Sequence, residues 1–201
     1  MKTDILNPFV KGLADGADEA LHADAKLMKT PSVEPDVGMF LEFLTYTLKP
    51  EKILELGCGI GVSTRYMQKG APYAHITALD YNKSRLDYAH QNCTGIDFVF
   101  ADVIDFMKRQ SEKYDMIFVD SMKKQYPMIL YYALKKLKPG GVIVFDDILM
   151  YGHVFSQDCE VPDKYIEVVR TLRNFIARVK VEHRHCILPI GSGVLLIYGE
   201  K

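Results

Sequence analysis

An apolar run that ends in a glycine-rich turn places the strongest constraint on this chain. The segment 52–56 is short and apolar, and Gly57, Gly59 and Gly61 follow it directly. This pattern is typical of a buried parallel strand that turns into a helix. Glycines at such a turn let the backbone approach a ligand closely, and the first N–H groups of the next helix face that ligand. The turn therefore predicts a ligand site at the carboxyl end of a strand in an α/β sheet.

Strand and helix patterns alternate from about residue 36 to the end of the sequence, without a repeat or a long linker. We expect helices over 36–48, 61–69, 82–91, 103–110, 124–137 and 163–180. We expect parallel strands over 52–56, 75–79, 96–100, 114–119 and 142–145, and a closing antiparallel hairpin over 182–188 and 194–198. The predicted fold class is therefore α/β, a doubly wound, Rossmann-like and mostly parallel sheet of seven strands. Residues 36–201 would form the single domain, and residues 1–35 a helical lid or partner segment.

Length and composition limit the classes of function. The chain has 201 residues, is 48% hydrophobic and carries a net charge of -1, which suits one compact domain and argues against a globally basic nucleic-acid binder. No stretch approaches the roughly 20 apolar residues of a membrane span, and the amino terminus lacks the apolar core of a signal peptide. The four cysteines show no metal or redox spacing. We expect a cytoplasmic protein with reduced thiols and no membrane partner.

The glycine spacing and the acids around it distinguish between cofactors. The Gly-x-Gly-x-Gly spacing is tighter than that of dinucleotide binders, and Glu55 precedes it. A carboxylate there would repel phosphates but suits the ammonium of a methionine-type amino acid. Asp80 ends the next strand at the distance typical of an acid that binds ribose hydroxyls, and Asp102 follows the third strand, where it suits an adenine edge. Asp80 alone can be a helix cap, but together these residues predict S-adenosylmethionine as the cofactor.

Three carboxylates follow two further strands. Asp120 comes after the strand over 114–119, and Asp146 and Asp147 come after the strand over 142–145. Carboxylates that converge at one sheet edge repel each other unless a cation neutralises them, so a hard ion such as Mg²⁺ is expected. Lys123 would have a lowered pKa beside such an ion and would suit a general base. Each residue alone can be a cap or a solvated loop residue; their joint placement favours the metal and base.

At this point the chain resembles the cation-dependent O-methyltransferases, the family of catechol and caffeoyl-coenzyme A O-methyltransferases. The resemblance covers about residues 30–201, and its most specific parts are Glu55–Gly61, Phe118–Tyr126, Phe145–Leu149 and Pro189–Gly193. It implies a class I methyltransferase fold and, as in many family members, a homodimer. The metal would be held by Asp120, Asp146 and Asp147, with Lys123 as the base. Together with the strand-end pattern, the resemblance implies a cofactor site lined by Val33, Glu55, Gly57, Cys58, Gly59, Ser63, Asp80, Tyr81, Ala101, Asp102 and Asp120.

The chain departs from the family at Asp147, where most members have asparagine. The additional carboxylate would tighten a cation but disfavour an anionic catecholate beside it. The resemblance thus implies divalent-metal-assisted methylation of a hydroxyl on a small aromatic or vicinal-diol molecule. Either catechol itself becomes a weaker candidate, or Asp147 is protonated or turned away from the cation.

Two other functions remain open. Some bacterial relatives methylate 5-hydroxyuridine in tRNA, and a basic cluster near the carboxyl terminus can track phosphates or simply be the solvated face of a helix. This cluster consists of Arg170, Arg173, Arg178, Lys180 and Arg184. The third function is a non-catalytic S-adenosylmethionine sensor, which the presence of Lys123 and Asp120 makes the least favoured.

Overall fold

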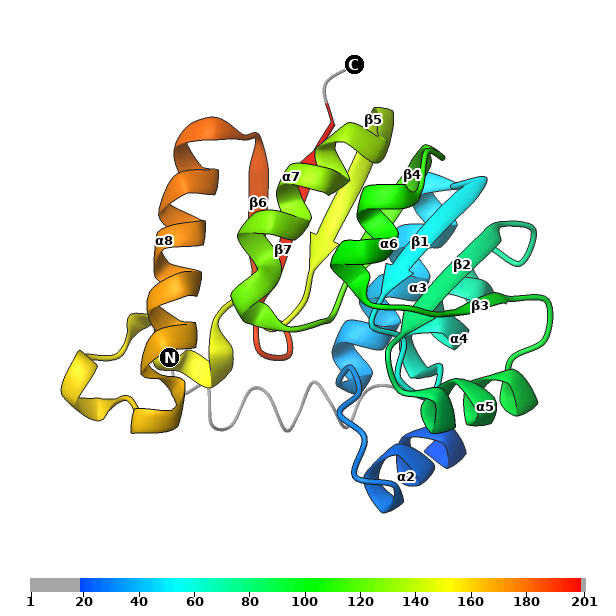
Figure 1. Ribbon diagram of the computed structural model, residues 1–201, viewed down its shortest axis with the longest axis horizontal. Coiled ribbons are helices and arrows are strands. Elements are labelled where there is room, and N and C mark those ends of the chain that lie inside the picture. The colour runs from blue at the N-terminus through cyan, green and yellow to red at the C-terminus, as the bar shows by residue number, and fades with distance from the viewer. Residues whose placement is uncertain (1–18, 200–201) are drawn as a thin grey trace.

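The computed structural model describes residues 19–199, which form a seven-stranded sheet with helices on both faces (Figure 1). The strand order is β3-β2-β1-β4-β5-β7-β6. The first five strands pair in parallel, and β7 is inserted antiparallel between β5 and β6. The strands are β1 (Lys52–Leu56), β2 (His75–Asp80), β3 (Asp97–Phe100), β4 (Tyr114–Val119), β5 (Leu137–Phe145), β6 (His185–Leu188) and β7 (Val194–Tyr198).

Two hydrophobic layers lie on opposite faces of this sheet because side chains alternate along each strand. In β1, Leu54 and Leu56 belong to the layer under α6 (Val103–Arg109), α7 (Tyr126–Lys136) and α8 (Ile166–Glu182). Ile53 belongs to the other layer, which the remaining helices cover. These helices are α2 (Glu19–Leu27), α3 (Pro35–Leu48), α4 (Val62–Gly70) and α5 (Lys83–Asn92). In Figure 1, α6 and α7 lie in front of the sheet, with α8 beside them.

The doubly wound α/β fold predicted from the sequence is confirmed, with two local corrections. The strand expected from residue 182 begins only at His185, because α8 continues to Glu182. An Arg178–Glu182 ion pair four residues apart, with a 2.8 Å contact, supports this last helical turn. The strand expected at 142–145 begins earlier, at Leu137. Its pairing with β4 shifts register between Tyr114 and Met116.

The segment before α3 is partly described. Residues 1–18 of the predicted lid lie outside the described residues. Within the rest, α2 buries Leu21 and Ala25 in the core layer that α3 and α4 share. The Tyr88 hydroxyl of α5 donates to Asp24 at 2.6 Å, so α2 is held to two helices of this face. Over residues 19–199, no helix has both the length and the apolar character needed to cross a membrane.

Candidate active site

The glycine turn after β1 has a conformation and a packing that exclude larger residues. Gly57 has φ +100°, and a Cβ at this position would overlap the backbone carbonyl oxygen of Asp120. The Gly57 N–H donates to Leu79 O at 2.9 Å, which fixes the turn against the end of β2. The Gly59 N–H donates to the Asp80 carboxylate at 2.9 Å. The turn is therefore held closely against the ends of two neighbouring strands.

Glu55 is a fully buried acid below this turn. Its carboxylate accepts hydrogen bonds from the hydroxyls of Ser63 and Thr64, the latter at 2.5 Å, at the start of α4. Burial raises the pKa of Glu55 from 4.5 to about 7, although the two hydroxyls act to lower it; Asp120 and Asp80 raise it further. A cation close to Glu55, such as an amino-acid ammonium, would stabilise its charged form.

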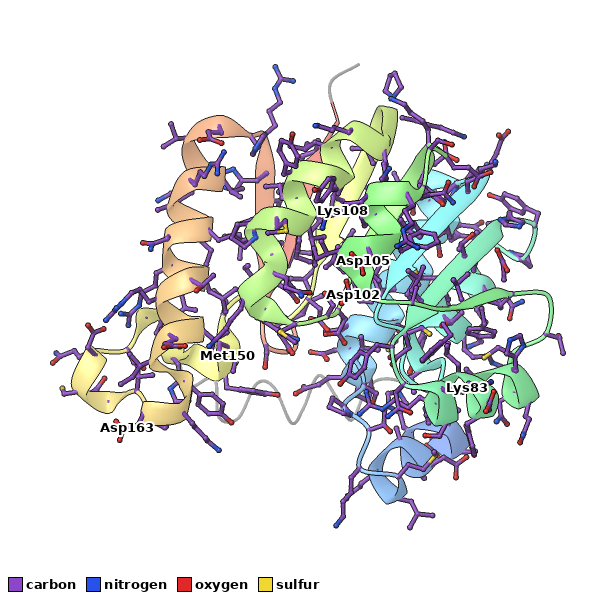
Figure 2. The ribbon with its side chains drawn as sticks, in the orientation of Figure 1. Lys83, Asp102, Asp105, Lys108, Met150 and Asp163 are labelled. Carbon is purple, nitrogen blue, oxygen red and sulfur yellow. The ribbon has the colours of Figure 1, made fainter. Side chains whose placement is uncertain are left out.

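The acids after β2 and β3 are held by backbone N–H groups. The buried Asp80 accepts from Gly59 and also from Asn82, at 2.8 Å. Asp102 accepts from the N–H groups of Ile104 and Asp105 at 2.9 and 3.0 Å, so it caps α6. Figure 2 labels Asp102 and Asp105 at the first turn of this helix. Both aspartates lie at the carboxyl edge of the sheet, where an open α/β sheet binds its ligand.

The other residues expected to line the cofactor site differ in exposure. Val33 and Ser63 are buried, Ala101 is half-buried and Tyr81 is 69% exposed beside Asp80. Cys58 is buried in the turn, where desolvation raises the pKa of its thiol well above the ordinary value. Cys58 is therefore a packing residue that stays protonated.

The acids after β4 and β5 surround one lysine. The Lys123 Nζ lies 2.9 Å from Asp120 Oδ1 and 2.8 Å from Asp147 Oδ2. The carboxylate of the buried Asp146 accepts the N–H of Asp147 at 2.7 Å. The Tyr126 hydroxyl donates to the Asp146 backbone oxygen at 2.8 Å, which ties the first turn of α7 to this strand end. These three acids and Lys123 are called the carboxylate cluster below.

This arrangement bears on two expectations from the sequence. Within residues 19–199, no three acidic, histidine or cysteine side chains are assembled to hold a metal, so Asp120, Asp146 and Asp147 do not form the expected site as they stand. The Lys123 ammonium lies between Asp120 and Asp147 and pairs with both. The lowered pKa expected of Lys123 applies beside a bound cation, so it stays a prediction. In the described arrangement burial acts to lower the pKa of Lys123, but Tyr126 and the carboxylates of Asp120 and Asp147 raise it and prevail.

The donor chemistry nevertheless fits a hard cation. Burial, together with the neighbouring Asp120 and Asp147 charges, raises the pKa of Asp146 well above its ordinary value. Burial likewise raises the pKa of Asp120. Three carboxylates and one ammonium leave an excess of negative charge, and carboxylate oxygens are the ligands that Mg²⁺ prefers. A divalent cation therefore suits the carboxylate cluster, provided that Lys123 withdraws from between its partners.

A small hollow of about 110 Å³ opens beside the carboxylate cluster. Its walls come from residues 31–37, from the ends of β4 and β5 with Tyr151, and from Ser192 in the β6–β7 turn. Asp36 of α3 accepts the Gly191 N–H at 2.9 Å, which fastens two of these walls together. We call this hollow the acceptor pocket.

The loop after β5, which contributes to this pocket, has an unusual backbone. Asp147, Met150 and Tyr151 have φ values of 56°, 48° and 54°, in the left-handed region that non-glycine residues rarely adopt. Met150 marks this loop in Figure 2. Strained backbone of this kind concentrates at functional sites, because only the surrounding structure holds it there.

The basic cluster of α8 is partly engaged in internal contacts. Arg173 donates to Val154 O at 2.8 Å and pairs with Asp158, while Arg178 pairs with Glu182. A larger hollow of about 1310 Å³, lined in part by Arg184, lies at the opposite end of the sheet, near the start of β5. It is thus separate from the carboxylate cluster.

Four residues that contribute to the site were missed in the sequence: Glu34, Asp36, Thr64 and Ser192. Thr64 follows Ser63 at a helix start and could have been found from that pairing. The other three are single polar residues in loops or at a helix start, and they reach the pocket only through tertiary packing.

Comparisons with known proteins agree with this geometry. A family model described as O-methyltransferase matches residues 13–199. A catechol O-methyltransferase from Niastella koreensis is 29% identical over 170 residues, which cover 77% of each chain. A caffeoyl-CoA O-methyltransferase from Stellaria longipes is 29% identical and covers 83% of this chain and 76% of its own.

Solved structures show the same fold. A methyltransferase from Podospora anserina with SAH bound has a TM-score of 0.84 at 21% identity, covering 98% of this chain and 95% of its own. An O-methyltransferase from Bacillus cereus in complex with SAH has a TM-score of 0.80 at 23% identity, covering 97% of each chain. These likenesses show the class I methyltransferase fold. From the family match over residues 13–199, the chain belongs to the O-methyltransferase family of S-adenosylmethionine-dependent enzymes.

Proposed function

We propose that the protein methylates a hydroxyl of a small aromatic or vicinal-diol molecule, with a divalent cation such as Mg²⁺ at the carboxylate cluster. The observation that supports this most is the acceptor pocket of about 110 Å³ beside Lys123 and its acids. Its volume is somewhat below the ~150 Å³ of a cavity that binds benzene, so one aromatic ring would fill it and reach its opening. The pocket lies at the sheet edge that also carries the glycine turn, so donor and acceptor would meet there.

The residues have distinct roles in this reaction. Glu55 faces the amino-acid end of the cofactor, and Asp80 accepts hydrogen bonds from its ribose hydroxyls. Asp120, Asp146 and Asp147 would hold the cation, which supplies positive charge that favours the deprotonated form of an acceptor hydroxyl. The acceptor oxygen forms a bond to the methyl carbon while the bond from that carbon to sulfur breaks, leaving S-adenosylhomocysteine.

Lys123 receives the acceptor proton in this scheme. In the described arrangement its ammonium is held by two carboxylates, which favours the protonated form. Lys123 can therefore act as a base only after it has released its own proton to solvent, which requires that its ion pairs with Asp120 and Asp147 are broken. Catalysis otherwise comes from positioning, because the sulfonium methyl is already activated.

The test is transfer of labelled methyl from S-adenosylmethionine to catechol-type phenols, with Mg²⁺ and with a chelator. Lys123→Met is compared with Lys124→Met, whose lysine is exposed and pairs with Glu167. Chelator-sensitive labelling that only Lys123→Met abolishes supports the proposal. Labelling that survives the chelator removes the cation from it, and no labelling of any diol removes the acceptor class.

A second acceptor class, tRNA, is favoured by one observation. Lys113 and Arg184 line the larger hollow and have no ion-pair partner within the described part of the chain. Phosphate contacts of this kind would make RNA binding strongly salt-dependent. Labelling of tRNA alone in the same assay would make the protein a tRNA-modifying enzyme.

We also propose a homodimer. Met39, Phe43 and Tyr46 form an exposed apolar stripe along α3, with Phe43 67% exposed. Light scattering of the protein in solution gives its mass and tests this proposal. A monomer at micromolar concentration would contradict it.

A further inference from the structure

Ser192 places a hydroxyl on the wall of the acceptor pocket. The residue is 7% exposed and lies in the turn between β6 and β7, at the same end of the sheet as the loop after β5 (Figure 1). Within residues 19–199, its hydroxyl makes no hydrogen bond to another group. The unpaired hydroxyl of Ser121 is sealed inside the protein, but that of Ser192 is not, so its exposed part faces the pocket that the residue lines.

The backbone of Ser192 is held on both sides. The Ser192 carbonyl oxygen accepts the N–H of Leu149 at 2.9 Å, which ties the turn to the loop after β5. The preceding Gly191 donates to Asp36 of α3 at 2.9 Å. The hydroxyl can therefore move only by rotation about the Cα–Cβ bond of Ser192. A group that is positioned in advance in this way loses little entropy when a ligand binds it.

The rest of the pocket lining is also polar. Apart from Pro31, Val37 and Tyr151, the described lining residues end in hydroxyl or carboxylate groups. Sites for small molecules are more often lined mainly by apolar side chains with a few polar groups. An apolar ring edge against Ser192 would displace water and leave the hydroxyl unpaired, which costs free energy. An acceptor with a further hydrogen-bonding atom avoids this cost.

The size of the pocket determines where that atom lies. A volume of about 110 Å³ is filled by one aromatic ring. When the diol of such a ring faces the carboxylate cluster, the ring also lies against the other walls, including Ser192. A polar atom bonded directly to the ring can then reach the Ser192 hydroxyl, whereas one on a longer side chain would lie at the opening of the pocket.

From these observations, and resting on the proposed function, we infer that Ser192 determines acceptor specificity and that the preferred acceptor is an aromatic triol, with a third hydroxyl on the ring bound to Ser192. The Ser192 hydroxyl donates to this group or accepts from it, since a hydroxyl can do both. Ser192 takes no part in methyl transfer itself. Its loss therefore changes which acceptor is preferred, while the reaction at the diol is retained.

The test uses two pairs of catechols in which a hydroxyl replaces a methyl group of similar size. The pairs are pyrogallol with 3-methylcatechol, and benzene-1,2,4-triol with 4-methylcatechol. The value of kcat/KM is measured for each compound with Mg²⁺ and without oxygen, and the ratio of triol to methyl compound is compared between variants. In at least one pair, Ser192→Ala should lower this ratio about tenfold, because one hydrogen bond in a buried site is lost. A purely structural effect would lower both values of kcat/KM together and leave the ratio unchanged.

Two further variants complete the comparison. Ser192→Cys keeps the shape of the side chain but has only a weak donor, so it should also lose most of the preference. It replaces Ser192→Ala if that variant does not fold. Ser111→Ala changes an exposed serine before the start of β4, at the other end of the sheet, and should keep the wild-type ratio.

Calorimetric binding of the same four compounds with S-adenosylhomocysteine separates this inference from the proposed function. If the triols bind more tightly and Ser192→Ala removes this preference, but no compound is methylated, the proposed function fails and the inference about Ser192 stands. If the compounds are methylated with a ratio that neither Ser192 variant changes in either pair, the inference is overturned while the function stands. Absence of both binding and methylation overturns both.

Discussion

Replacement of the buried Glu55 by glutamine should make the free protein more stable at alkaline pH. The folded state holds the Glu55 proton up to a pKa of about 7, whereas the unfolded chain releases it near 4.5. Between these values the unfolded state binds fewer protons, so the free energy of unfolding falls as pH rises. The difference of about 2.5 pKa units corresponds to about 3 kcal/mol, which is the full cost of ionised Glu55 above pH 7.

Glutamine has the same shape and does not titrate, so it avoids this cost. The hydroxyls of Ser63 and Thr64 can satisfy it, because a hydroxyl both donates and accepts. Glu55→Gln should therefore gain up to about 3 kcal/mol over wild type above pH 7, and this gain should vanish toward pH 4.5. The same change should weaken S-adenosylmethionine binding by about tenfold, since a charged hydrogen-bond acceptor is lost.

Urea unfolding of both proteins without cofactor, from pH 5 to pH 9, measures this difference. Glu42→Gln is the control, because it makes the same change at a half-buried acid of α3 that pairs with Lys69. A stability difference between Glu55→Gln and wild type that stays constant over this pH range would refute the reasoning, as would a destabilised variant at pH 8.

Three further changes test other parts of the structure. Gly57→Ala should lower the free energy of unfolding by roughly 2–4 kcal/mol, because its Cβ would overlap the Asp120 carbonyl at a positive φ; urea unfolding measures this. Lys123→Met should lower kcat about a hundredfold or more with little change in the Kd for S-adenosylmethionine, and a kcat within threefold of wild type would exclude Lys123 as the base. Asp36→Ala removes the acceptor of the Gly191 N–H and should cost about 1–2 kcal/mol while raising the acceptor KM; unchanged KM and stability would show that this bond is unimportant.

The parts of the site that could be predicted from the sequence are those marked by a local pattern. Apolar runs followed by glycine or an acid located the ends of β1, β2 and β4, and parallel pairing then places these ends at one edge. The boundary predicted between α8 and β6 was wrong because residues 182–184 are polar and show neither helical nor strand periodicity. The Arg178–Glu182 pair that supports the last helical turn has a spacing of four residues, so it could have been used to extend the predicted helix.

The contacts that could not be predicted depend on tertiary packing. Lys123 meets Asp147, whose backbone adopts a left-handed conformation that nothing in its sequence neighbourhood requires. Glu34 and Asp36 lie far from the strand ends in sequence and reach the acceptor pocket only when α3 packs on the sheet. Single polar residues without periodicity give no sequence pattern from which such a position can be inferred.

The β6–β7 turn is the last wall of the acceptor pocket to be synthesised. The glycine turn, Asp80 and Asp120 leave the ribosome long before the β6–β7 turn, whose Gly191 binds Asp36. A chain shortened before Gly191 would retain the cofactor residues but lack one wall for the acceptor. It would also lack β7 and leave β5 as an unpaired edge strand, which favours aggregation. An incomplete copy would thus keep the residues for the methyl donor without a complete place for an acceptor.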